Sequence, residues 1–110
     1  MKMVVLILQR VEMMQPILER LERRGVHGAT ILDCKGAASA LENYTDGSFL
    51  GSLRAVLEPA REQNQMMFTV VADEKVDLVF DTIEEFVDLD KPYQGVAFTV
   101  PVDFARGIRL

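Results

Sequence analysis

Two amphipathic helical repeats separate four short apolar segments of this chain, and that order restricts the possible folds more than any other feature. Apolar residues recur at helical spacing between Glu12 and Arg24 and again between Asp73 and Val87. Pro16 suits the first turn of the first helix, and Gly25 suits its end. Asp73 is expected to cap the second helix. Each helix would bury one stripe and expose the other face.

The apolar segments have the length and β-branched content of strands. They predict strands at Met3–Leu8, Ala29–Lys35, Met66–Ala72 and Val96–Val102. The order is therefore β-α-β-β-α-β, which predicts a ferredoxin-like α+β sandwich in which a four-stranded antiparallel sheet carries both helices on one face. At 110 residues, the chain is expected to form a single domain over 1–110.

The strands are too apolar for a sheet with one wet face. Met3–Leu8 is apolar at every position, and Met66–Phe68 continues the same pattern. Something must cover the second face of the sheet. A symmetric oligomer would do so, and the alternative is that the central segment of the chain folds over it.

That central segment, at about 36–65, is longer than an ordinary connection between adjacent strands. Ser39 and Glu42 have capping-box spacing, and the region near Leu53 has the pattern of a short amphipathic helix. One interpretation is a loop that engages a partner, and the other is a helix that covers the sheet. The residues predicted to contact a partner are Tyr44, Phe49, Leu50 and Arg54.

Composition excludes several function classes. The net charge of -5 opposes binding to a nucleic-acid backbone, which needs a basic surface. The longest apolar run near the start, Met3–Leu8, is far shorter than a membrane span, and no signal peptide is predicted. Cys34 is the only cysteine, so no internal disulfide can form and the cytoplasm is the expected location.

No catalytic or metal site is predicted. His27 and Cys34 are separated by an extended stretch, so a nucleophile–base pair within one chain is not expected, and Cys34 is interpreted as a buried structural thiol. One histidine, one cysteine and Asp33 do not provide the spaced ligands of a zinc site. The acidic pairs Glu84-Glu85 and Asp88-Asp90 are interpreted as solvated charge.

A ligand site is predicted where the second strand ends. Backbone N–H groups that follow a strand and open a helical turn can receive an anion. Charge and stacking could come from side chains near the fourth strand and the C-terminus. The residues concerned are Gly36, Ala37, Ala38, Ser39, Lys91, Tyr93, Arg106 and Arg109.

Several stretches resemble the PII nitrogen-regulatory signal family. They are Met1–Ile7, Thr30–Gly36 leading into the long central segment, Val70–Asp73, and Gln94–Val100 with its glycine-containing turn. The likeness extends over most of the chain, and it lies in length and order more than in any single motif.

The resemblance implies a regulatory protein and not an enzyme. It implies a homotrimer whose sheets line a central core, adenine nucleotides as effectors in the clefts between subunits, and a protruding loop that contacts a target protein. Carried over by position, Ile7, Thr30 and Gly36 match the adenine-side wall, Gly95 matches the turn, and Arg109 matches a terminal basic residue.

The chain also departs from the family pattern. Val96 stands where the family has a phosphate-binding lysine, and Ser39 and Ala40 replace an arginine and a glutamine at the loop base. One terminal basic position falls on Gly107, beside Arg106. These changes argue against a triphosphate and favour a different or less charged ligand. A small oligomeric ferredoxin-like enzyme and a structural interaction protein remain alternatives, because the fold alone does not separate them.

Overall fold

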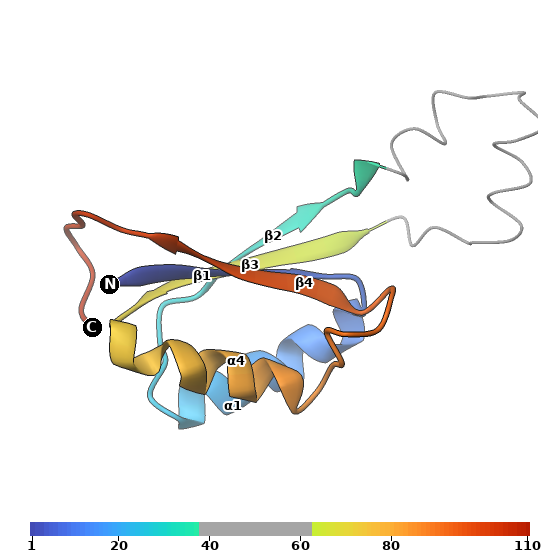
Figure 1. Cartoon of the computed structure of the whole chain (residues 1–110), viewed down its shortest axis with the longest axis horizontal. Helices are drawn as coiled ribbons and strands as arrows, with labels where there is room; N and C mark the ends of the chain where they lie inside the picture. The colour runs from blue at the N-terminus through green and yellow to red at the C-terminus, as the bar shows by residue number, and fades with distance from the viewer. Residues whose placement is uncertain (38–62) are drawn as a thin grey trace, which may run out of the picture.

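The computed structural model describes residues 1–37 and 63–110. Within these residues, four antiparallel strands form one sheet in the order β2-β3-β1-β4. The strands are β1 (Lys2–Leu8), β2 (Thr30–Cys34), β3 (Asn64–Val71) and β4 (Gly95–Pro101). Helices α1 (Met14–Arg23) and α4 (Val76–Glu84) lie together on one face of the sheet (Figure 1). The predicted ferredoxin-like α+β arrangement is confirmed.

Helix α1 follows the sequence signals closely. It buries Met14, Ile17 and Leu21, which are members of the predicted apolar stripe. Pro16 lies in the first turn, where its missing N–H breaks no helical hydrogen bond. Gly25 has a φ of 85°, a conformation that favours glycine, and ends the helical run. The helix begins later than predicted because residues 11–13 form a 3₁₀ turn.

The start of α4 differs from the prediction. Asp73 lies in a 3₁₀ turn that precedes the helix, and its carboxylate caps no backbone N–H. Instead, Asp73 Oδ1 lies 3.1 Å from the amino group of Met1. This ion pair explains why the carboxylate does not cap the helix. The helix ends at Glu84, although Val87 beyond it is still buried against the core.

The hydrophobic core lies between the helices and one face of the sheet. Side chains alternate along each strand, so every second residue of β1 faces this core. Val4, Leu6 and Leu8 are all completely buried there. They pack in one cluster with residues of β3 and of both helices, which include Met67, Val71, Ile17, Leu21, Val79 and Ile83.

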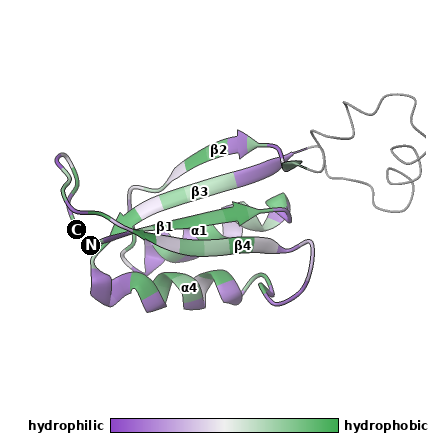
Figure 2. Ribbon diagram, turned by 45° about the horizontal axis from the view of Figure 1, so that its top comes forward, coloured by the Kyte–Doolittle hydropathy of each residue, from purple (hydrophilic) through white to green (hydrophobic). Residues whose placement is uncertain are grey.

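The opposite face of the sheet carries a continuous apolar surface, which we call the open face. The register pairs Met3, Val5 and Ile7 of β1 with residues of β3 and β4 that point to the same side. These partners are Val70, Phe68 and Met66 of β3 and Val100, Phe98 and Val96 of β4. Figure 2 shows apolar residues continuing along β1 and β4. The absence of a polar face confirms the pattern expected from the sequence.

Much of the open face is exposed to solvent in a single chain. Phe98 is 42% exposed and Val96 is 59% exposed, whereas Val5 in the middle of the face is only 4% exposed. Val5 is covered because it pairs with Phe68 on one side and Phe98 on the other. Exposed apolar surface of this extent is typical of an interaction surface.

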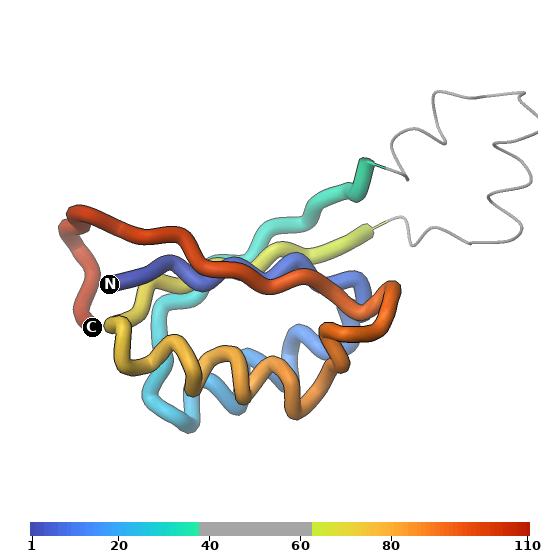
Figure 3. The backbone as a smooth tube through the Cα atoms, viewed as in Figure 1, coloured from blue at the N-terminus to red at the C-terminus, as the bar shows by residue number. Residues whose placement is uncertain are grey.

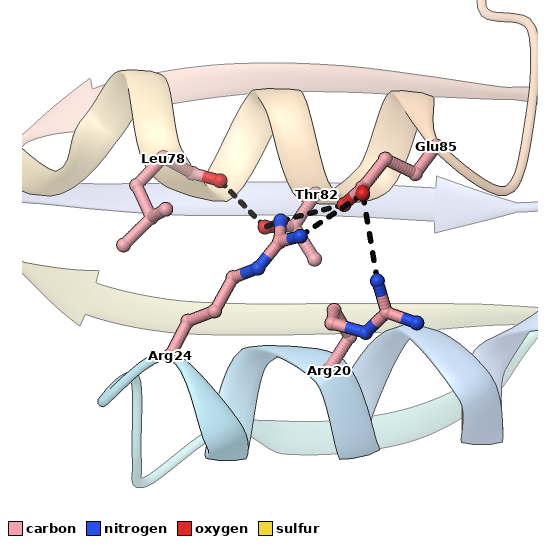
Figure 4. Close-up of polar contacts among 5 residues, drawn as sticks. All are labelled: Arg20, Arg24, Leu78, Thr82 and Glu85. Carbon is pink, nitrogen blue, oxygen red and sulfur yellow. Dashed lines mark hydrogen bonds and ion pairs between the residues drawn. The ribbon is translucent and has the colours of Figure 1, made fainter.

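Arg24 joins the ends of the two helices. Its guanidinium donates to both carboxylate oxygens of Glu85, at 2.9 Å for Oε1, and to Thr82 Oγ1 at 2.7 Å. Thr82 donates in turn to the Leu78 carbonyl, and Arg20 reaches Glu85 at 3.5 Å (Figure 4). The sequence had indicated a solvated charge at Glu85. Instead, Glu85 forms an ion-paired link between the two helices.

This link predicts a specific response to acid. The hydrogen bond from Arg24 holds the pKa of Glu85 below its ordinary value of 4.5. Because the folded pKa is the lower one, the carboxylate stabilises the fold above pH 4.5, and this contribution disappears as the pH falls through the folded pKa. The free energy of unfolding, measured with urea, should fall between neutral pH and about pH 3 in both proteins. The fall should be smaller for Glu85→Gln than for the wild type, because the variant has no carboxylate to protonate at this position.

Glu84→Gln is the matched control, because Glu84 is exposed on the same helix and forms no ion pair within the described parts of the chain. We expect its loss of stability in acid to equal that of the wild type. Equal acid responses of Glu85→Gln and Glu84→Gln would show that the Arg24 link carries no pH-dependent stability.

Candidate functional site

The structure describes most of the predicted ligand residues. Ala38 and Ser39 lie outside the described residues, and so do the predicted partner-binding residues, which are Tyr44, Phe49, Leu50 and Arg54. The remaining ligand residues, apart from Thr30, fall into two groups at different ends of the sheet.

The first group gathers where β1 ends and β4 begins, which we call the turn end. Ile7 pairs with Val96, and the next residue of β1 pairs with Gly95. The end of β2 lies at the same end of the sheet, since its last residue, Cys34, pairs with the first residue of β3. Gly36 and Ala37 come shortly after Cys34 in the chain. Lys91 and Tyr93 belong to the connection that leads into β4.

Close backbone contacts hold the turn end in shape. The carbonyl O of Gln94 accepts hydrogen bonds from the backbone N–H groups of Gln9 and Arg10, at 3.0 and 3.3 Å. A Cβ atom on Gly95 would lie 2.9 Å from the carbonyl O of Ile7, so only glycine fits. Tyr93 has a φ of 64° and is 60% exposed. A non-glycine residue in this conformation is uncommon and is often found at functional sites.

The second group lies at the opposite end of the sheet, which we call the tail end. The last residue of β4, Pro101, pairs with Lys2, and the chain then turns back toward the start of α4 (Figure 3). Arg106 stacks on Phe104, with 5.5 Å between the guanidinium carbon and the ring centre. Arg109 lines a pocket beside His27 and Ala72. Both predicted arginines are therefore far along the sheet from Gly95.

Thr30 stands between the two groups. It pairs with Phe68, which in turn pairs with Val5 near the middle of β1. A single chain therefore does not bring the predicted ligand residues together in one cleft. A site that uses Ile7 and Gly95 together with Arg109 needs the turn end of one chain and the tail end of another.

The residues considered for nucleophilic or metal chemistry lie apart from one another in the fold. His27 Nδ1 lies 2.9 Å from Glu22 Oε2, and both side chains are exposed. Cys34 lies at the other end of β2, so the two cannot act as a pair within one chain. Cys34 is half-buried and not fully buried as predicted, because β2 is an edge strand. Among the described residues, no three histidine, cysteine or carboxylate side chains gather as a metal site.

Two basic residues that lie at the turn end and the tail end were not predicted from the sequence. Arg10 lies at the turn end, where its side chain contacts Glu12 and the Gln94 side chain at 3.2 and 3.4 Å. Lys75 lies at the tail end in the pocket that Arg109 lines. Neither stands in a recognisable motif. The sequence signal for both was weak: Arg10 directly precedes the 3₁₀ turn at residues 11–13, and Lys75 directly precedes α4.

One protein-family model matches this chain. The model of the family described as nitrogen regulatory protein P-II matches residues 1–110, the whole chain. The chain belongs to the P-II family. A search of curated proteins finds no significant match. The family match confirms the resemblance that the sequence segments indicated, and P-II proteins are regulatory signal proteins.

The structure adds to this P-II assignment at the turn end. Val96, which follows the turn glycine, points to the open face beside Ile7 and is 59% exposed. The described cations of this P-II chain at the turn end include Arg10 and Lys91, and the Lys91 ammonium lies 3.9 Å from Asp88. None of the helices in 1–37 and 63–110 has the length and apolar character needed to cross a bilayer.

Proposed function

We propose that this P-II protein works as a homotrimer that senses a small effector and regulates a target protein. The observation that carries the proposal is the open face, an apolar surface that spans three strands on the side of the sheet without helices. Three copies that pack these faces around a common axis would remove Phe98, Val96 and Val100 from water. An assembly of this kind would not need the central segment to cover the sheet.

The two separated groups of ligand residues also support this arrangement. In a ring of three chains, the turn end of one chain and the tail end of its neighbour could border one cleft. Ile7, Gly36 and Gly95 would then come from one subunit, and Thr30 and Arg109 from the next. This division explains why residues predicted for one site lie at different ends of a single sheet.

We propose an adenine nucleotide as the effector, with a preference for fewer phosphates. Tyr93 offers an exposed ring for stacking, and Lys91 of the same connection offers an exposed cation, which lies 3.9 Å from Asp88. Val96 supplies no charge after the turn glycine, so a triphosphate gains less here than it would from a lysine. The preferred ligand would therefore be a mono- or diphosphate.

Thermal unfolding with AMP, ADP and ATP tests the effector, because a ligand that binds only the native state raises the midpoint. AMP or ADP is expected to raise the midpoint more than ATP, and Tyr93→Ala should reduce the rise. Glu19→Gln, on the exposed side of α1 and at neither end of the sheet, serves as a control. No rise with any of the three nucleotides at millimolar concentration would contradict an adenine effector.

We propose that the segment at about 36–65 contacts the target protein, through Tyr44, Phe49, Leu50 and Arg54. Its length exceeds what is needed to join two adjacent antiparallel strands, β2 and β3. Effector binding at Gly36 and Ala37 would act on the base of this segment and so bias target binding. The single cysteine, Cys34, requires no oxidising compartment, which favours work in the cytoplasm.

A further inference from the structure

A pocket of about 230 Å³ lies at the tail end within a single chain. Four parts of the chain form it: the turn between α1 and β2, the end of β3, the turn before α4, and the C-terminal residues. Its lining consists of Gly25, Val26, His27, Val70, Val71, Ala72, Lys75, Arg109 and Leu110. This volume is below the range of about 300–1,000 Å³ that is usual for drug-sized ligands, so the pocket suits a small molecule.

The ionisable side chains that line this pocket are all basic. They are His27, Lys75 and Arg109, and the terminal carboxylate of Leu110 is the one acidic group on a lining residue. In a chain whose net charge is -5, such a grouping is a local reversal of the overall sign. His27 is paired with Glu22, whose Oε2 lies 2.9 Å from His27 Nδ1 and which does not line the pocket.

Lys75 is the best placed of the three to bind an anion. Its side chain is half-buried, and its Nζ donates to the carbonyl O of Gly25 at 3.2 Å. That contact fixes the ammonium at the pocket wall but leaves its charge unpaired, because a carbonyl is neutral. An ammonium has three donors, so others remain for a ligand. Arg109 forms no ion pair or hydrogen bond within the described parts of the chain.

We propose that this pocket binds a small phosphate-bearing anion within one chain, with Lys75 as its central ligand and Arg109 and His27 at its rim. The site goes beyond the proposed function, because it is complete in one chain and does not depend on a nucleotide or on the trimer. Arg109 is also predicted for the cleft between chains. The test therefore depends on Lys75, which lines the pocket and belongs to no other predicted site.

Inorganic phosphate is the probe, titrated into the ¹⁵N-labelled protein against chloride at matched ionic strength. Saturable chemical-shift changes are expected at the amides of Gly25, His27 and Lys75. Lys75→Met should weaken phosphate binding by at least about tenfold, as expected for loss of a charge-assisted contact. Lys75→Arg keeps the charge and should bind within a few-fold of the wild type, which separates loss of charge from loss of fold.

Lys35→Met is the matched control, because Lys35 is an exposed lysine that follows β2 at the opposite end of the sheet, does not line the pocket and belongs to no predicted site. It should bind phosphate like the wild type. Unchanged binding in Lys75→Met, or shifts confined to residues near Lys91 and Arg10, would overturn the proposal. Failure of nucleotides to bind would leave the phosphate result intact, so the two proposals can fail separately.

Discussion

Phe68→Lys is expected to convert the assembled protein into folded monomers, whereas Leu6→Lys is expected to unfold it. The two residues are on neighbouring central strands but face opposite sides of the sheet. Phe68 points to the open face, where it pairs with Val5, and it is only partly buried in a single chain. A lysine there would remain in water in the monomer but would be buried in the proposed assembly.

Leu6 is completely buried in the core beneath the helices. A charge at this position would cost several kcal/mol without a partner, a large part of the roughly 5–15 kcal/mol that stabilises a typical domain. Light scattering and circular dichroism distinguish the outcomes, and Phe68→Leu is the apolar control. If Phe68→Lys keeps the wild-type mass, the open face is not the subunit interface. If Leu6→Lys stays folded, the assignment of the two faces is wrong.

Gly95→Ala is expected to destabilise the protein by about 1–3 kcal/mol, the usual cost of forcing an extra carbon into a packed site. The added Cβ would lie 2.9 Å from the Ile7 carbonyl O and 3.5 Å from Leu8 Cα. Because both of these neighbours are backbone atoms, relief requires β4 to move away from β1. The turn that holds Tyr93 would move with it, so nucleotide binding should weaken as well.

Gly36→Ala is the matched control for stability. Its Cβ would meet the end of the Asn64 side chain at 3.4 Å, and that side chain can move aside. We expect a change within about 0.5 kcal/mol, as for most surface substitutions. Urea unfolding of the two variants measures the difference. Equal midpoints would show that the close approach at Gly95 does not constrain the two strands.

Local patterns were enough to predict the layers of this fold. Pro16 indicated the first turn of α1, and Gly25 indicated its end. The continuous apolar run in β1 correctly indicated a sheet that is apolar on both faces. Both features depend on neighbours in sequence or on the two-residue repeat of a strand. The position of Pro101 at the end of an edge strand was predictable for the same reason.

Features that depend on distant parts of the chain were not predictable. Asp73 has the chemistry of a helix cap, but the amino group of Met1 lies beside it in the fold. The sequence also did not show which of Leu6 and Phe68 faces the core. In a run that is apolar at every position, either set of alternate residues could face it. The cations around the tail-end pocket come from three separate parts of the chain, and nothing in their sequence spacing links Lys75 to Arg109.

The mass of the wild-type protein in solution tests the central claim most directly, because both the interchain cleft and the coverage of the open face depend on assembly. Multi-angle light scattering at micromolar concentration is expected to give three times the chain mass of 12.4 kDa. A single species of 12.4 kDa would contradict the account, since the open face would then remain in water and the turn end and tail end could not form one site.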